Sequence, residues 1–389
     1  MNKDIKSRTS DELIRILTTI VKKCRILIFL LFILRASSFE LRASSPGTSS
    51  ADFLNIGIGA RQAGMGEAAV GLADDVSALY WNPAGLGSLA QQELGFMHTQ
   101  WLDGITYEYL AYAHPVKSLG TFAGHFSLLN YGSIPSFDEG GASLGQTSAR
   151  DTMGAVGWGS PLVGDRLRIG LSSKWIVEKL ASFSAHTVAL DVGGLVSVWE
   201  SPQSTVQLGG GIRNLGSGLK FVSETNPLPQ TLYLGLGLKA LHEKLAVALD
   251  GNLPRDSGLN GRLGIEYWIH PLVAFRAGFT QGRKEAGTGI NSGIGLQIGQ
   301  WHLDYAFSDF GKLGFAHRAE VRWKFGGFEE ESYEEGRVLM KHGRPAEAIL
   351  KFYKVLQMNP RHKRAILRLK ECRDMLGTEQ ELLKETKQP

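Results

Sequence analysis

The chain has 389 residues and a net charge of +4, and its 42 Lys and Arg are spread along the sequence. A charge that is small and dispersed excludes the basic patch on which nucleic-acid binding depends. The 48 glycines, against 13 prolines and without a Gly-x-y period, exclude collagen and a proline-rich linker. They indicate many strands whose backbones approach closely. Of the two cysteines, Cys24 lies in a segment that we expect to be removed, which leaves Cys372 and no internal disulfide.

The N-terminus has the pattern of a secretory signal. Its longest apolar run, Ile26 to Leu34, follows basic residues and is shorter than the roughly 18 residues that a membrane-spanning helix needs. Small residues of the kind that signal peptidase prefers follow at 36–38. We therefore expect residues 1–43 to be a signal peptide, with the cut between Ala36 and Ala51. The alternative is a short buried helix.

Between residues 92 and 328, apolar and polar residues alternate with period two over segments of about ten residues that end in turn residues. The run from Leu232 to Lys239 is one example, and the run from Val273 to Thr280 is another. Roughly fourteen such segments predict an all-β transmembrane barrel of antiparallel strands in a bacterial outer membrane. The alternative is a soluble β-sandwich, which rarely carries aromatic residues at so many strand ends.

The last of these segments predicts which face meets lipid. Its two faces carry Val321, Trp323 and Phe325 on one side and Glu320, Arg322 and Lys324 on the other. Turning the charged face outward would cost roughly 2–4 kcal/mol for each cation at mid-bilayer. We therefore expect the apolar face to point to lipid, which sets the register of the strand.

A barrel of this size needs a filled interior. Fourteen strands tilted near 40° give a backbone radius of about 14 Å, which strand side chains alone do not fill. The Gly/Ala-rich residues 51–91 precede the first expected strand and show little alternation. We predict that they form a plug in the lumen.

Residues 64–86 read Gly-Met-Gly-Glu-Ala-Ala-Val-Gly-Leu-Ala-Asp-Asp-Val-Ser-Ala-Leu-Tyr-Trp-Asn-Pro-Ala-Gly-Leu. This stretch resembles the N-terminal signature of the PorV/PorQ family, which belongs to the wider FadL-like barrels. The resemblance runs from about Ala51 to Phe328. It implies a fourteen-stranded outer-membrane barrel whose N-terminal segment folds into the lumen as a hatch.

Within this signature, Asp74 or Asp75 can cap the N-terminus of a short helix that runs through Tyr80. Pro83 holds Asn82 out of helical geometry, so the chain should turn there. This turn either joins the plug to the wall or serves as the hinge of a gate. The candidate plug and gating residues are Asp74, Asp75, Asn82, Pro83, Ala84 and Gly85.

The resemblance leaves two functions open. PorV-like members bind exported proteins in type IX secretion and hand them on, whereas FadL-like members pass hydrophobic small molecules. We predict the first function, with the second as the alternative. No zinc motif, Gly-x-Ser-x-Gly elbow or phosphate loop occurs, so we expect no cofactor, no metal and no enzyme activity. A barrel phospholipase or protease with a site assembled from distant strands is a third alternative.

From residue 329 the apolar period changes to 3.6, which predicts helices. The spacing matches one tetratricopeptide repeat followed by a capping helix, over residues 329–376, and residues 377–389 are expected to be a flexible tail. Leu339 and Ser332 depart from the usual aromatic residues, and the alternative is an incidental helical hairpin. Gly336, Gly343, Ala348, Phe352 and Pro360 stand at the spacing of the repeat, and the last four are the expected repeat-core residues.

One repeat alone does not bury its apolar face, so a partner surface is implied, either the barrel rim, a second copy or another envelope protein. An even number of strands places both barrel termini on one side, and we expect the N-terminal segment to begin in the periplasm, so the repeat should be periplasmic. Arg361, Lys363, Arg364 and Arg368 are the candidate partner-binding residues. They would meet an acidic partner or lipid headgroups, or else form an ordinary solvated face.

Overall fold

The computed structural model describes residues 47–163, 166–201, 203–221, 223–281, 287–326, 328–359 and 362–385. The expected signal peptide, residues 1–43, lies outside this range. None of the helices in the described part of the chain is long and apolar enough to cross a membrane.

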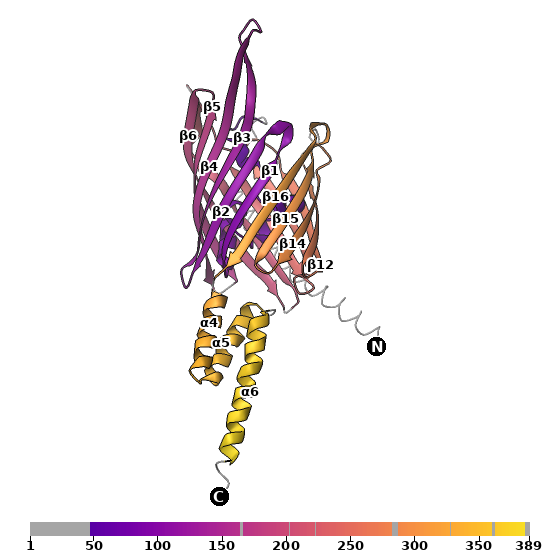
Figure 1. Cartoon of the computed structure of the whole chain (residues 1–389). Helices are drawn as coiled ribbons and strands as arrows, with labels where there is room; N and C mark the ends of the chain where they lie inside the picture. Colours follow the sequence, from indigo (N-terminus) through magenta and orange to yellow (C-terminus); the bar gives the residue numbers. More distant parts are fainter. Residues whose placement is uncertain are drawn as a thin grey trace, which may run out of the picture.

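Fourteen antiparallel strands close into a barrel in which β1 pairs with both β2 and β16, as the sequence predicts (Figure 1). The wall strands are β1 (Gln92–Gln100), β2 (Thr106–Val116), β3 (Gly120–Phe137), β4 (Ser143–Val163), β5 (Leu167–Leu180), β6 (Phe183–Glu200), β7 (Thr205–Gly216), β10 (Thr231–Ala240), β11 (Leu245–Pro254), β12 (Asn260–His270), β13 (Val273–Thr280), β14 (Ile290–Ile298), β15 (Trp301–Asp309) and β16 (Phe315–Phe325). The short strands β8 (Leu219–Phe221) and β9 (Glu224–Asn226) pair within the connection from β7 to β10. A closed barrel has no free sheet edge, so every wall strand has two neighbours.

The faces of the strands follow the alternation of the sequence. On β16, Val321 points outward with 38% of its surface exposed, whereas Glu320 and Arg322 point into the lumen with 2% and 3%. Trp323 stacks on Trp301 of β15, with ring centroids 5.5 Å apart, on the outer face. The predicted register of the last strand is therefore confirmed.

The two ends of the barrel differ in their connections. At one end they are short, such as residues 271–272 and 299–300, and at the other they include the longer stretches 217–230 and 281–289. We name these the short-turn end and the long-loop end. β1 begins and β16 ends at the short-turn end. At the long-loop end β3 and β4 project beyond their neighbours (Figure 1).

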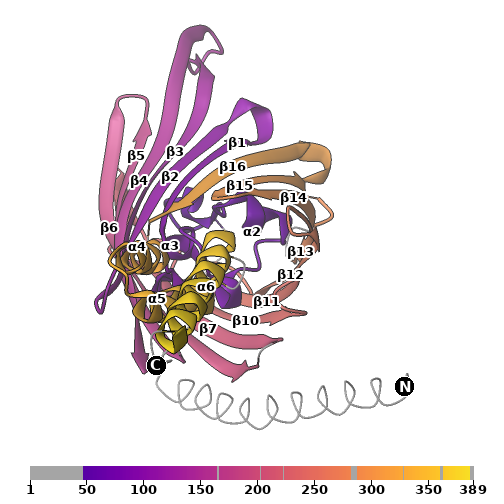
Figure 2. The ribbon, with the colours of Figure 1, turned by 60° about the horizontal axis from the view of Figure 1, so that its bottom comes forward.

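Residues 51–91 lie inside the barrel, where Figure 2 shows the short helices encircled by the strands. We refer to them as the plug. Their side chains are almost all buried. The plug is built from short turns because glycine and alanine are frequent in it and no long apolar stripe is present. Its elements are η1 (Asp52–Asn55), α2 (Ala60–Gly64), η2 (Val70–Leu72), α3 (Ala78–Trp81) and η3 (Pro83–Ser88).

The described chain starts at the long-loop end, not at the end where β1 begins. The backbone N–H of Ser50 donates to the carbonyl oxygen of Pro227, at 2.9 Å, and the hydroxyl of Ser49 bonds to Asp256; both partners lie in connections at the long-loop end. The plug then crosses the lumen to reach Gln92. Hydrogen bonds to distant loops thus hold residues 49–50 at the long-loop end. The expected periplasmic start of the N-terminal segment concerns residues that include those before 47, outside the described range, and stays a prediction.

Three helices follow the barrel and lie beyond its short-turn end (Figure 1). They are α4 (Phe328–Lys341), α5 (Pro345–Met358) and α6 (Lys363–Glu385), and we refer to them as the helical tail. Phe328, expected as the last residue of the barrel, begins α4. α6 extends past residue 376, the expected end of the capping helix, to Glu385, since these residues are mostly strong helix formers. The flexibility of residues 377–389 stays a prediction.

Candidate functional site

Glycines of the wall allow the plug backbone to lie directly on the strands. A Cβ added to Gly278 of β13 would lie 2.0 Å from the backbone nitrogen of Gly66, and one added to Gly170 of β5 would lie 2.1 Å from the carbonyl carbon of Pro83. Gly66 itself has a φ of +64°, a conformation that favours glycine. No side chain fits between plug and wall at these points. Much of the high glycine content of the chain therefore serves the seating of the plug.

Carboxylates of the wall accept hydrogen bonds from the plug backbone. Asp250 of β11 accepts from the N–H groups of Ala69 and Val70, at 2.7 and 2.9 Å. Glu320 of β16 accepts from the N–H of Ala60, the first residue of α2, at 2.8 Å. These bonds satisfy buried backbone donors that the short plug helices leave without an intrahelical partner.

Ion pairs, buried or partly buried, join the plug to three parts of the wall. The Arg61 Nε atom lies 2.9 Å from Glu266 of β12, and Asp75 Oδ2 lies 2.9 Å from Arg322 Nη1 of β16. Asp74 Oδ2 pairs with Lys239 Nζ of β10 at 2.7 Å. Removing one partner of a buried pair such as Asp75–Arg322 typically costs about 3–5 kcal/mol, because the other charge is left without compensation. The plug is thus bound by electrostatics as well as by close packing.

Arg61 and Glu266 belong to this network although the sequence did not single them out. Arg276 bridges Glu266 and Asp304, at 2.6 and 2.7 Å, and so extends the network along the inner wall. For Glu266, the local sign was an inward-facing charge on a strand, β12, whose other face is apolar. Alternation shows that such a charge faces the lumen, but not which distant residue it meets.

The predicted helix cap at Asp74 or Asp75 is wrong. Helix α3 begins after Ser77, whose side chain makes no capping bond. Asp75 accepts from the N–H of Ser77, at 3.0 Å, in a turn that precedes the helix, and its other oxygen pairs with Arg322. The two oxygens of Asp75 therefore have different partners, the backbone of the turn and a guanidinium of the wall, so this carboxylate links the plug to β16.

The turn at Asn82 has the geometry that Pro83 imposes. Asn82 is extended, with φ −162° and ψ 101°, and its Oδ1 accepts from the N–H of Ala84 at 3.2 Å. Its amide nitrogen donates to the carbonyl oxygen of Gly194 on β6, at 3.0 Å. A Cβ added to Gly85 would lie 2.2 Å from the carbonyl oxygen of Ala73. This buried turn fastens two parts of the plug and the wall together, and a gating role stays a prediction.

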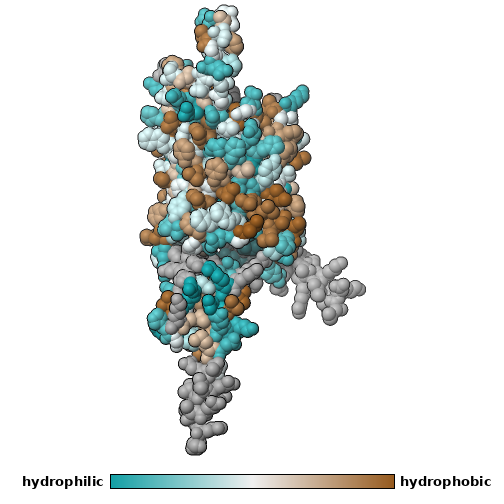
Figure 3. Space-filling view, viewed as in Figure 1, coloured by the Kyte–Doolittle hydropathy of each residue, from teal (hydrophilic) through white to brown (hydrophobic). Residues whose placement is uncertain are grey.

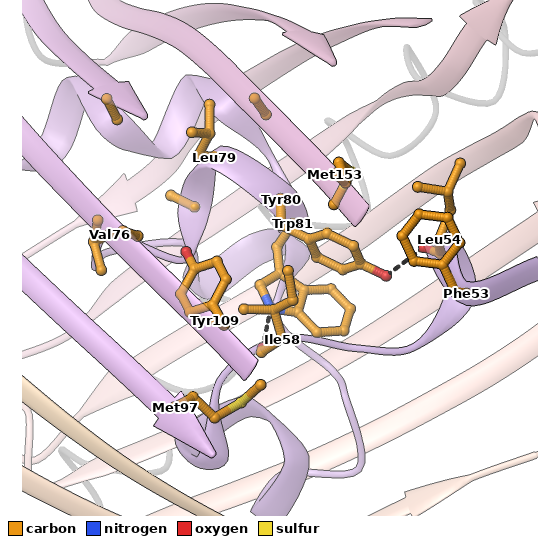
Figure 4. Close-up of a cluster of buried hydrophobic side chains, with 14 of the residues drawn as sticks. Phe53, Leu54, Ile58, Val76, Leu79, Tyr80, Trp81, Met97, Tyr109 and Met153 are labelled. Carbon is orange, nitrogen blue, oxygen red and sulfur yellow. Dashed lines mark hydrogen bonds between the residues drawn. The ribbon is translucent and has the colours of Figure 1, made fainter. Parts of the chain in front are cut away.

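Aromatic residues of α3 form the apolar core of the plug (Figure 4). The Tyr80 hydroxyl donates to the carbonyl oxygen of Leu54, and the Trp81 indole N–H donates to that of Ile58, both at 2.8 Å. The two rings pack edge to face, with centroids 4.8 Å apart. These bonds join α3 to η1 and to the segment after it. The same core includes wall side chains such as Met97, Tyr109 and Met153, so it is shared between plug and wall.

The outer wall is apolar and has one large hollow. Apolar side chains gather on the barrel wall toward the end that carries the helical tail (Figure 3). On β3 and β4 the outward positions 124 and 154 are glycines, and a Cβ added to Gly154 would meet nothing within 4 Å. The hollow has a volume of about 740 Å³, and we name it the outer groove. The apolar side chains around it include Leu94, Leu110, Phe126, Val156, Trp175 and Val188.

The helical tail brings together most of the expected repeat core. Ala348 and Phe352 are fully buried, and Gly343 turns the chain between α4 and α5 with a φ of +70°. A Cβ added to Gly336 would lie 2.7 Å from the Phe352 ring, so this glycine is needed for helix packing. Pro360 lies outside the described residues.

The structure describes the side chains of two of the four candidate partner-binding residues of the tail, Arg364 and Arg368. The Arg364 guanidinium lies over the Tyr333 ring, at 4.7 Å, and Arg368 pairs with Glu371 on the same helix. Arg361 and the side chain of Lys363 lie outside the described part of the chain. Among the described residues, no group of three or more His, Cys, Asp or Glu side chains is placed to hold a metal ion.

Comparisons with known proteins concern the barrel. The model of an uncharacterised protein family (UPF0164) matches residues 37–155, which is less than half of the chain. No curated protein matches the chain. Among solved structures, the toluene transporter TbuX of Ralstonia pickettii is similar, with 13% identity and a TM-score of 0.44 over 69% of this chain and 99% of that one.

Two further solved barrels are similar to a comparable extent. The toluene transporter TodX of Pseudomonas putida has 15% identity and a TM-score of 0.44, over 68% of this chain and 96% of its own. A FadL homologue of Pseudomonas aeruginosa has 10% identity and a TM-score of 0.39, over 69% of this chain and 98% of its own. At such identities and TM-scores, none of the three similarities identifies a ligand for this chain.

Proposed function

We propose that this protein is an outer-membrane channel of the FadL-like kind that carries small hydrophobic molecules, with the outer groove as a binding place at the lipid-facing wall. The closed barrel with an apolar exterior and a polar, plugged interior supports a place in an outer membrane. Short turns at one end and longer loops at the other support an orientation with the short-turn end in the periplasm.

The outer groove is the single observation that carries this proposal. Outward glycines on β3 and β4 leave a hollow among large apolar side chains, of a size that suits a hydrophobic solute. Phe126 lies opposite Gly154 in the strand register, and Val156 lies opposite Gly124, so each glycine makes room beside a large neighbour. An apolar molecule dissolved in the bilayer would gain packing there that a flat wall does not offer.

A substitution that fills the outer groove with a larger side chain tests this proposal. In Gly154→Leu the new side chain occupies the hollow, and we expect the affinity for a fluorescent hydrophobic probe in detergent, and probe uptake by liposomes that contain the protein, to fall about tenfold, the equivalent of 1.4 kcal/mol. The matched control is Gly251→Leu, which adds the same side chain at an outward position of β11, away from the groove. Equal probe binding by the two variants would contradict the proposal.

A second function, the binding of exported proteins in a type IX-like secretion pathway, is supported by the helical tail. Its α5 and α6 helices leave large apolar side chains exposed, including Leu350 at 69% and Leu367 at 58%. A tetratricopeptide-like unit of this kind, placed in the periplasm, would dock an exported protein or another envelope protein. This is also the function that a PorV/PorQ-like assignment of the chain implies.

Deletion of the helical tail distinguishes the two proposed functions. Removal of residues 329–389 should leave barrel insertion and hydrophobic-probe binding unchanged and should abolish crosslinks to an envelope partner if the secretion function holds. Crosslinking with mass spectrometry on the intact and truncated proteins in parallel measures this. An unchanged set of crosslinked partners after truncation would contradict the docking role, and cleavage of the tail by protease added to whole cells would contradict the periplasmic placement.

A further inference from the structure

A second cavity lies in the lumen at the long-loop end, away from the outer groove. Its volume is about 230 Å³, and we name it the luminal pocket. Tyr80 and Leu54 of the plug line one side of it, and residues at the long-loop ends of β7, β11 and β12 line the other. Unlike the outer groove, this pocket is lined mostly by polar side chains. Its charged side chains are Glu67, Asp256, Arg213 and Arg262, and its neutral polar ones include Asn252 and Asn260. The Asp256 carboxylate accepts from the Ser49 hydroxyl.

Arg213 is a buried cation that lacks a carboxylate partner among the described residues. Only 6% of its surface is exposed, and its Nη2 donates to Asn252 Oδ1 at 2.7 Å. Its guanidinium lies over the rings of Tyr233, Tyr80 and Trp81, at 4.7, 5.6 and 5.7 Å. The interaction energy that ring faces and one neutral amide supply is smaller than the hydration free energy that a guanidinium loses when it is buried. By contrast, the neighbouring Arg262 lies 3.4 Å from the carboxylate of Glu67.

Several polar atoms around the same pocket lack a hydrogen-bond partner in the described structure. They are the Nε atoms of Arg213 and Arg262, Nδ2 of Asn252 and Oδ1 of Asn260. Three of these four atoms are donors, and two of the three belong to guanidinium groups. Buried polar side-chain atoms are usually bonded, so a group of unbonded donors around one cavity favours an occupant with acceptor oxygens.

We propose that the luminal pocket binds a small hydrophilic oxyanion, a carboxylate or a phosphate, from the long-loop side. One anionic oxygen group would supply the charge that Arg213 lacks and would accept from the free N–H groups of Arg213 and Asn252. The pocket is smaller than the roughly 300–1,000 Å³ of typical sites for drug-sized ligands, so the ligand is a small one. Since Tyr80 belongs to the plug, an occupant would touch plug and wall together.

An isosteric substitution tests the charge argument directly. Asn252→Asp keeps the shape of the side chain and places a carboxylate 2.7 Å from Arg213 Nη2, so the protein supplies the missing anion itself. We expect the affinity for the oxyanion to fall at least about tenfold. Arg213→Gln should weaken binding to a similar extent. The control is Asn226→Asp, which makes the same charge change on the exposed strand β9 at the same end of the barrel and should leave the affinity within about twofold.

The measurement is isothermal titration calorimetry on the full-length mature protein in detergent. The probes are inorganic phosphate and acetate, against sodium chloride at matched ionic strength and glucose as a neutral polar solute. Heat-modifiable migration on gels checks that each variant is folded. Binding of phosphate alone, or of acetate alone, supports the proposal and identifies the anion class. The proposal is overturned if neither anion binds beyond chloride, if glucose binds as tightly, or if Asn252→Asp behaves like Asn226→Asp.

Discussion

Asp75 of the plug and Arg322 of β16 form a buried ion pair, with Oδ2 and Nη1 2.9 Å apart, although 247 residues separate them in the chain. Arg322 also pairs with Asp304 of β15, at 2.8 Å. The plug is therefore bound to an arginine that also holds the wall strands β15 and β16 together.

We expect Asp75→Asn to loosen the plug without preventing closure of the barrel. The substitution keeps the side-chain shape but leaves part of the buried Arg322 charge uncompensated, at a cost of about 3–5 kcal/mol. Limited proteolysis of the purified protein should then cut within residues 51–91. Asp138→Asn, in the exposed connection between β3 and β4, serves as the control. Equal protection of the plug in both variants would show that the ion pair does not hold it.

A side chain added at Gly278 should displace the plug. The Cβ of Gly278→Val would lie 2.0 Å from the backbone nitrogen of Gly66, a distance that the packed backbone cannot accept. We expect raised ion conductance in planar bilayers, close to that of a protein from which residues 51–86 are deleted. Gly251→Val adds the same side chain on the outer face of β11 and should conduct as little as the unchanged protein. Conductance that does not differ among these forms would mean that the plug does not block the lumen.

The outward face of β16 predicts the effect of a charge at Val321. Val321→Arg should reduce the fraction of heat-modifiable barrel recovered in the membrane, because an arginine on the lipid face costs about 2–4 kcal/mol near the bilayer midplane. Val321→Leu keeps the apolar character and should assemble normally. Recovery of the two variants in equal yield would place this face away from lipid.

Cys372 should report the folding of the helical tail. Its thiol is buried among α4 to α6, and burial raises its pKa above the ordinary value, so maleimide should label it slowly in the native protein. Phe352→Ala, which removes a core side chain at a cost of about 3–5 kcal/mol, should speed the labelling strongly. Leu350→Ala, at an exposed position of α5, should not.

Because the pKa of the Cys372 thiol is raised in the folded tail, the stability of the tail should depend on pH. Above the pKa of the unfolded thiol, the unfolded tail loses this proton more readily than the folded tail does, so the stability of the tail should decline as the pH rises through that range. Chemical unfolding of the tail at increasing pH measures it, and Cys372→Ser should remove this part of the decline. An equal decline in both proteins would assign it to other groups.

Period-two alternation alone determined which faces of the wall strands point out of the barrel, as Val321 and Arg322 show, because neighbouring side chains on a strand must point to opposite sides. The turn at Asn82 and Pro83 was also predictable from the sequence, since proline restricts the backbone conformation of the residue before it in any fold. In the tail, the shared burial of Ala348 and Phe352 was also predictable, because residues four apart lie on the same face of a helix.

Only the tertiary structure decided the partners of the inward charges. The local pattern predicted Asp75 as a helix cap, whereas in the closed barrel its Oδ2 pairs with Arg322, which lies 247 positions away in the chain. Likewise, the seating of Gly66 on Gly278, and the gathering of Arg213 and Asn252 around one cavity, depend on where the plug crosses the lumen. Such contacts join residues far apart in sequence, and no local pattern encodes the distance between them.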